Sequence, residues 1–155
     1  MVRKDRRGPT GRIVVGIDGS PESMLALRWA LAEAKLRGVA LRVVHTWAYP
    51  YIAAGPALDP VLDADIIDNA ERVAEGVARS QLDELGDARV GVDIERSIVE
   101  GAPAPALLEA AEGADLLVVG SRGRGGFTGL LLGSVSQQCA HHASCPVVIV
   151  RASAH

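Results

Sequence analysis

Short apolar runs alternate with amphipathic stretches along the chain. Five of the runs are rich in Val, Ile and Leu and carry few charges, which is typical of strands buried in a parallel sheet. Between them, apolar residues recur every three or four positions, which predicts helices. The pattern predicts strands over 12–18, 39–47, 92–101, 114–120 and 145–151, and helices over 21–37, 63–85, 103–111 and 134–143.

This strict alternation predicts an α/β fold, with an open five-stranded parallel sheet, helices on both faces and a Rossmann-like arrangement. Ligands of such sheets bind beyond the carboxyl ends of the strands. Asp18 ends the first expected strand, His45 and Thr46 the second, and Gly120 the fourth. We therefore expect these four residues on the ligand side. Ser20 is the expected cap of the first helix and Gly38 its stop.

Length and composition bound the classes of protein. At 155 residues the chain suits one domain over 12–151, preceded by a disordered basic tail over 1–11 and followed by a short tail over 152–155. A net charge of −3 argues against a nucleic-acid partner. No apolar run reaches membrane-spanning length and no secretory signal opens the chain, so neither a membrane partner nor export is expected and the location is taken as cytoplasmic.

Two segments leave alternatives open. Residues 48–62 hold three prolines and little charge, which suits either a binding lid or a surface crossover. The run "CAHHASC" at 139–145 places two cysteines and two histidines together, but structural zinc sites draw ligands from separate segments. We therefore favour a buried Cys139, histidines at the negative end of a helix dipole, and Cys145 packed at a strand entry, with no metal ligands.

The glycine-rich stretch 120–134 holds the strongest chemical signal. Gly120, Gly123, Gly133 and Ser134 form the pattern G-x2-G-x9-G-S between a buried strand and a helix. Glycines let backbone N–H groups approach phosphate oxygens, and the helix that begins here, with Val135 in its first turn, favours an anion. Arg122 and Arg124 offer positive charge, although loop arginines are often only solvated. A flexible surface loop is the alternative.

Three stretches resemble the universal stress protein family: "VVGIDGS" at 14–20, "GSRGRGGFTGLLLGSVS" at 120–136 and "CPVVIVR" at 145–151. The resemblance covers residues 12–151, as a single-domain member, and the glycine pattern marks the ATP-binding subgroup. It implies an adenine nucleotide alpha hydrolase-like fold, a homodimer, and ATP bound with a divalent cation such as Mg²⁺. It also implies a role in stress response or dormancy.

Residue by residue, the resemblance implies that Gly120 lies by the ribose and that Gly123, Gly133 and Ser134 hold the phosphates. Asp18, followed by Gly19, would lie by the nucleoside. The adenine contact falls on Thr46, where valine is common in the family, and the contact is expected to use backbone atoms. The nucleotide set is Asp18, Gly19, Thr46, Gly120, Arg122, Gly123, Gly133, Ser134 and Val135.

Other interpretations of single residues stay open. Asp18 can simply form an Asx-turn before Gly19 and Ser20. His45 suits a general base or a packed strand residue, and the second is favoured. Ser121 and Thr128 suit phosphate acceptors or solvated loop residues, with the second favoured.

The chemistry favours a nucleotide-binding regulatory module that acts through an unidentified protein partner. The alternative is a slow ATP hydrolase or nucleotidyl-transferring enzyme. No lysine follows a glycine as in a Walker loop, and no motif supplies a carboxylate pair, so no catalytic residue is assigned. The last strand, with four uncharged β-branched residues at 147–150, is expected at a sheet edge where it pairs two copies into a homodimer.

Overall fold

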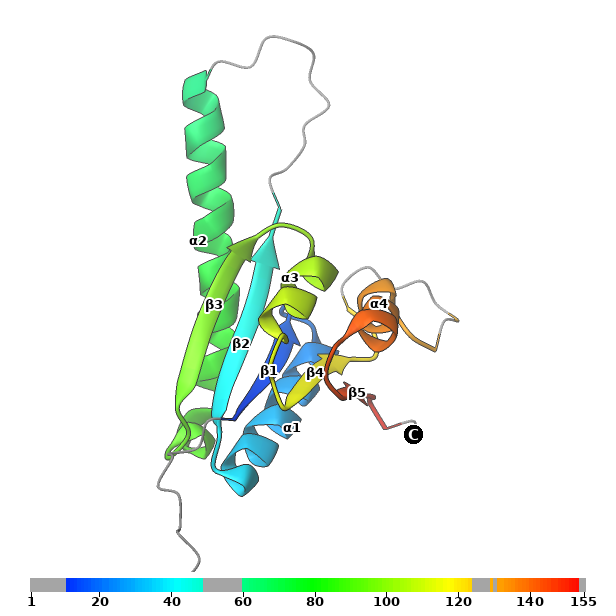
Figure 1. Cartoon of the computed structure of the whole chain (residues 1–155). Helices are drawn as coiled ribbons and strands as arrows, with labels where there is room; N and C mark the ends of the chain where they lie inside the picture. The colour runs from blue at the N-terminus through cyan, green and yellow to red at the C-terminus, as the bar shows by residue number, and fades with distance from the viewer. Residues whose placement is uncertain (1–10, 49–59, 124–128, 130, 154–155) are drawn as a thin grey trace, which may run out of the picture.

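The computed structural model describes residues 11–48, 60–123, 129 and 131–153. They form one five-stranded parallel sheet in the order β3-β2-β1-β4-β5, as the alternating pattern predicted. Because the strand order turns back at β1, the sheet has its switch point between β1 and β4 (Figure 1). The strands are β1 (Arg12–Ile17), β2 (Ala40–Trp47), β3 (Ile94–Glu100), β4 (Leu116–Gly120) and β5 (Val147–Val150).

Helices cover both faces of the sheet. On one face, α1 and α2 pack on Ile13, Val15 and Ile17 of β1, and on the other, α3 and α4 pack on the neighbouring Val14. The alternate side chains of one buried strand therefore feed two separate cores. The helices are α1 (Pro21–Arg37), α2 (Pro60–Glu84), α3 (Pro103–Ala110) and α4 (Ser134–His142), with a short 3₁₀ turn, η1 (Gly86–Arg89), after α2.

Most element boundaries follow the local signals in the sequence. The Ser20 hydroxyl accepts from the Ser23 N–H and caps α1, Pro21 occupies the first helical position, and Gly38 ends the helix with a φ of 67°. The helix expected from residue 63 begins at Pro60 instead, because proline is tolerated in a first helical turn. Within the described ranges, no helix is both long and apolar enough to span a membrane.

Four expectations fall partly or wholly outside the described residues. They concern the basic tail, of which only Gly11 is described, the core of the proline-rich segment over 49–59, the loop residues Arg124 and Thr128, and the second half of the C-terminal tail, 154–155.

The expected packing of the "CAHHASC" run is confirmed. Cys139 is fully buried in the core under α3 and α4, while His141 and His142 are exposed in the last turn of α4. Cys145 is partly buried and packs on the same core. Burial, and secondly the charge of Cys145, raise the pKa of Cys139 from 9.0 to about 11.

This raised pKa predicts a loss of stability in alkali. Between about pH 9 and pH 11 the thiol ionises in the unfolded chain but stays protonated in the folded one, so the free energy of unfolding falls as pH rises through that window. We expect the stability advantage of the wild type over Cys139→Ala to shrink across this range, measured by urea unfolding. An advantage that stays constant from pH 8 to pH 11 would contradict the prediction.

Candidate functional site

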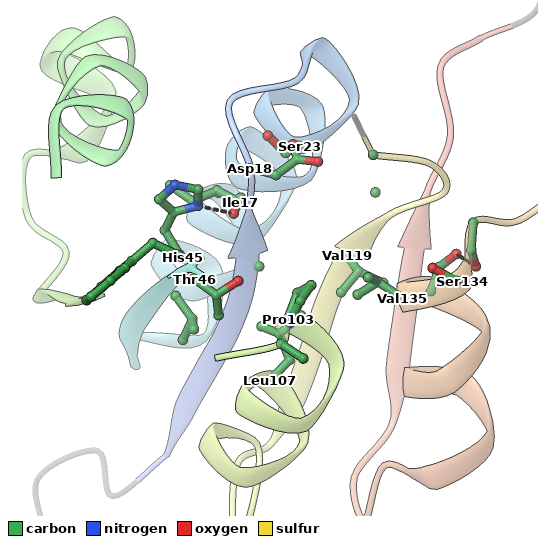
Figure 2. Close-up of a pocket in the computed structure, with 18 of the residues that line it drawn as sticks. Ile17, Asp18, Ser23, His45, Thr46, Pro103, Leu107, Val119, Ser134 and Val135 are labelled. Carbon is green, nitrogen blue, oxygen red and sulfur yellow. Dashed lines mark hydrogen bonds between the residues drawn. The ribbon is translucent and has the colours of Figure 1, made fainter. Parts of the chain in front are cut away.

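A cleft of about 1000 Å³ opens where the carboxyl ends of the strands meet. Its lining comes from the ends of β1, β2 and β4, the β3–α3 turn, one side of α2 and the first turn of α4. Figure 2 shows Asp18, Thr46, Leu107 and Ser134 arranged around this space, with Thr46 and Ser134 on opposite sides. The cleft therefore lies at the switch point, where open α/β sheets bind their ligands.

The structure brings eight of the nine predicted nucleotide residues into the lining of this one cleft. Gly19 is the exception: it lies outside the lining, and its N–H donates to the Gln81 side-chain oxygen at 3.1 Å. The amide of Gly19 therefore serves the fold rather than the cleft. The eight residues in the lining are Asp18, Thr46, Gly120, Arg122, Gly123, Gly133, Ser134 and Val135.

Asp18 forms the Asx-turn that the sequence allowed, and it also lies in the cleft. Its Oδ1 accepts from the Ser20 N–H at 2.9 Å, which closes the Asx-turn before α1. The same side chain lies in the lining of the cleft (Figure 2). The local turn therefore fixes the position of the carboxylate and still leaves the side chain in the cleft lining.

The first two glycines of the pattern are needed for space. A Cβ on Gly120 would lie 3.2 Å from the backbone of Glu22, so this glycine allows the end of β4 to pack on the start of α1. A Cβ on Gly123 would lie 2.5 Å from Oδ2 of Asp18, so this glycine leaves room for the carboxylate. Neither residue has a positive φ, and the reason for glycine here is close approach, not left-handed backbone.

The third glycine, Gly133, precedes α4 and has no side chain that could accept from the first-turn N–H groups. Gly133 is the N-cap residue, with φ −75° and ψ 170°, and no side chain caps the helix. Its own N–H is occupied, because it donates to the Ser121 carbonyl at 2.7 Å. Ser134 is the first helical residue and is exposed. Within the described part of the chain, the N–H groups of residues 134–136 have no hydrogen-bond acceptor.

Ser136 is a site residue that the sequence analysis missed. Its buried hydroxyl lies 3.0 Å from the carbonyl oxygens of both Ser121 and Gly133. Together with the Gly133–Ser121 bond, these contacts tie the start of α4 to the end of β4. The glycine loop is thus anchored at both of its ends, and Ser121 is buried rather than solvated.

α4 differs from the other two helices that open on the cleft. The first-turn N–H of Ser23 in α1 is taken by Ser20, and α3 has proline at its first and third positions. Proline has no N–H, so the start of α3 offers few donors. Within the described residues, the first turn of α4 therefore offers the cleft more N–H groups without an acceptor than the first turn of α1 or α3, at the positive end of its dipole.

The opposite side of the cleft is apolar and was not predicted residue by residue. Val44 of β2 and Leu107 of α3 line this side, and one face of α2 completes it. Val119 also lines the cleft, but Figure 2 shows it beside Val135 at the start of α4. The same carboxyl-edge rule could have predicted part of this lining, because residues 101–103 follow β3 at the carboxyl edge of the sheet. The α2 residues in the lining are Ala70, Val73, Ala74 and Val77.

His45 is held by the backbone. Its Nδ1 lies 2.8 Å from the Ile17 carbonyl oxygen (Figure 2). A carbonyl only accepts, so Nδ1 carries a proton and donates to Ile17. The contact joins the ends of β1 and β2, which supports the packed-strand role over a general base.

The arrangement suits a ligand with one anionic end and one flat apolar end. The amides of α4 and the exposed Arg122 favour anionic oxygens, and the apolar side accommodates an aromatic ring. Asp18 is the one carboxylate among the described residues of the lining.

Known proteins share both the sequence and the fold. The profile of the universal stress protein family matches residues 9–151. A universal stress protein of Mycobacterium tuberculosis strain H37Rv is 42% identical over 147 residues, which cover 94% of this chain and 45% of the relative. The chain thus spans about half the length of the curated relatives it matches.

Two solved structures are similar along their whole length. A universal stress protein in complex with cAMP is 32% identical, with a TM-score of 0.66 and coverage of 92% of this chain and 98% of that one. UspA from Lactobacillus plantarum is 23% identical, with a TM-score of 0.77 and coverage of 92% and 99%, and it supports the fold alone. The glycine pattern, the five-stranded parallel sheet and these matches agree, and the chain belongs to the universal stress protein family.

Proposed function

We propose that the chain binds ATP in this cleft and acts as a nucleotide-dependent regulatory module in stress response or dormancy. The uncapped start of α4 is the observation that carries the proposal. Three consecutive N–H groups at the positive end of a nine-residue helix, with Arg122 nearby in the lining, suit phosphate oxygens. Gly123 and Gly133 would border the phosphates, and Gly120 the ribose.

The adenine would occupy the apolar side of the cleft. Thr46 lies in this lining, one residue before the end of β2, and its backbone would contact the base. A similar protein, 32% identical over nearly all of the chain, was solved with cAMP, which supports an adenine nucleotide as the ligand class. Asp18, fixed by its Asx-turn, would lie by the nucleoside.

The cleft also fits Mg²⁺ carried by the nucleotide. Mg²⁺ keeps several waters and is usually bound through phosphates and one or two carboxylates. The described lining offers one carboxylate, Asp18, and no cluster of three ligating side chains. The residues therefore suit an ion that arrives with the phosphates, whose charge it would neutralise, rather than a resident metal site.

Nucleotide binding should stabilise the fold. A ligand at about a hundred times its dissociation constant adds roughly 2.7 kcal/mol to the free energy of unfolding. For a domain of this size that raises the melting temperature by about 5–10 °C. We expect such a shift with millimolar ATP and Mg²⁺ in a thermal unfolding assay. The absence of any shift with ATP, ADP and AMP would refute the proposal.

Hydrolysis should be very slow or absent. Fast phosphoryl transfer needs several positioned charges and a residue that orients the nucleophile. Within the described lining, the charged groups are Asp18 and Arg122, and Nδ1 of His45 is already engaged by Ile17. We therefore expect phosphate release well below about 1 s⁻¹, the lower end of the range of ordinary kinases. A purified preparation that turns over faster would favour the enzyme alternative.

A further inference from the structure

Gln81 is a buried polar side chain in the middle of an otherwise apolar helix face. It lies in α2, far along the chain from the glycine pattern, and is 6% exposed. Its buried neighbours are Ala78 and Leu82 of α2 and Leu85 just after the helix, which pack in the core. A buried amide costs free energy unless its hydrogen bonds are made, so its partners show what it does.

Those partners are the backbone of the β1–α1 turn. The Gln81 Oε1 accepts from the Gly19 N–H at 3.1 Å, and its Nε2 donates to the Ser20 carbonyl at 3.3 Å. Gly19 can only donate and the carbonyl can only accept, so the orientation of the amide is fixed. Further contacts of Nε2 and Oε1 with the Ser23 hydroxyl, at 3.1 and 3.3 Å, complete the network.

This turn carries Asp18 into the cleft. Gln81 holds the residue that follows Asp18, and the Ser20 N–H holds Oδ1 of Asp18 itself. On the other side, the Ile17 carbonyl is held by His45. The position of the Asp18 carboxylate is therefore fixed through both of its chain neighbours, Ile17 and Gly19. The hydrogen bond to Gly19 comes from α2, which is distant in the sequence.

We propose that Gln81 is a positioning residue for the nucleotide site: it holds the Asp18 carboxylate in the orientation needed to contact a bound nucleotide. The inference rests on the proposed function. It also links two walls of the cleft, because α2 supplies both Gln81 and the apolar side chains Ala74 and Val77.

The test is a double-mutant cycle in ATP affinity, measured by calorimetry with Mg²⁺ present. The variants are Gln81→Leu, Asp18→Asn and the two combined. Asparagine keeps an oxygen for the Ser20 N–H, so the turn should survive in Asp18→Asn. We expect Gln81→Leu to weaken binding about tenfold or more, since two hydrogen bonds to the turn are lost. In the Asp18→Asn background, Gln81→Leu should weaken binding little further, because Gln81 acts through Asp18.

Leu82→Ala is the control for a general loss of stability. Leu82 is the next residue of α2, packs in the core and lies outside the cleft lining. It should lower the free energy of unfolding at least as much as Gln81→Leu, yet change ATP affinity less than about twofold. If Gln81→Leu does not fold, Gln81→Glu enters the same cycle, since it keeps an acceptor for Gly19 and loses the donor to Ser20.

The outcomes separate the two proposals. Wild-type protein that binds no ATP, ADP or AMP overturns both. Wild-type binding with unchanged affinity in the folded Gln81 variant overturns the positioning role alone. The positioning role is also overturned if the Gln81 substitution weakens ATP binding as much in the Asp18→Asn background as in the wild type. Additive losses of affinity would mean that Gln81 does not act through Asp18.

Discussion

Gly133→Asp should abolish ATP binding while leaving the fold at least as stable as the wild type. Gly133 is the N-cap of α4 and already has the extended backbone, φ −75° and ψ 170°, that capping residues adopt. An aspartate there would accept from the first-turn N–H groups and improve the cap by a few tenths of a kcal/mol over glycine. Its carboxylate would also occupy and repel the anion site. We expect the thermal shift with ATP to disappear and the melting temperature without ATP to stay level or rise.

Two controls separate these effects. Gln138→Glu adds the same charge to an exposed position of α4 outside the cleft lining, and it should keep the ATP shift. Gly133→Ala adds a methyl group with only ordinary contacts, at 3.5 Å or more, and should weaken binding far less than aspartate. A Gly133→Asp variant that still binds ATP like the wild type would show that the start of α4 is not the phosphate site.

Substitution of Gly123 gives a less decisive test. A side chain at Gly123 would displace the Asp18 carboxylate, since even a Cβ lies 2.5 Å from Oδ2. Weaker binding by Gly123→Val would therefore not distinguish a blocked loop from a displaced Asp18. Gly133 is the sharper position, because its own surroundings accept a side chain.

The sequence predicted the architecture because strand and helix periods are local properties. Ser20, Pro21 and Gly38 marked the ends of α1 through capping chemistry that involves only near neighbours. The carboxyl-edge rule then placed Asp18, Thr46 and Gly120 in one cleft without knowledge of the strand order.

Contacts between distant segments could not be predicted in the same way. The grip of Gln81 on Gly19 spans 62 positions, and no local pattern distinguishes Gln81 from a solvated helix residue. The hydrogen bond from the Ser136 hydroxyl to the Ser121 carbonyl likewise joins two residues 15 positions apart, which no local pattern brings together. The packing reason for glycine at 120 and 123 could not be predicted either, because close approach to Glu22 and Asp18 is visible only in three dimensions.

The edge position expected for the last strand is confirmed: β5 pairs with β4 on one side and ends the sheet (Figure 1). Its residues Val147–Val150 are only partly buried and carry no charge. An apolar edge of this kind tends to pair with another chain. We propose that two copies pair antiparallel through β5, which gives the two-fold contact of most homodimers.

The backbone direction of β5 identifies the residue that tests this dimer. The carbonyl of Pro146 accepts from the N–H of Leu117 in β4, and the carbonyl of Val150 accepts from the N–H of Ser121, which directly follows β4. Backbone groups alternate sides along a strand, so those of Val148 also face β4 and those of Val147 and Ile149 face the free edge. A proline at Val148 would damage the sheet itself, whereas a proline at Ile149 removes an N–H from the free edge alone.

Ile149→Pro should therefore convert a dimer into a folded monomer. By analytical ultracentrifugation at micromolar concentration, we expect the wild type at twice 16.2 kDa and the variant at 16.2 kDa, with the ATP shift of the variant preserved. Ile149→Ala is the matched control, because it shortens the same side chain but keeps the N–H, and it should remain dimeric. A monomeric wild type would refute pairing through β5, and a dimeric Ile149→Pro variant would place the interface elsewhere. Since β5 adjoins β4, which ends at Gly120 in the cleft, the variant also shows whether nucleotide binding needs the second copy.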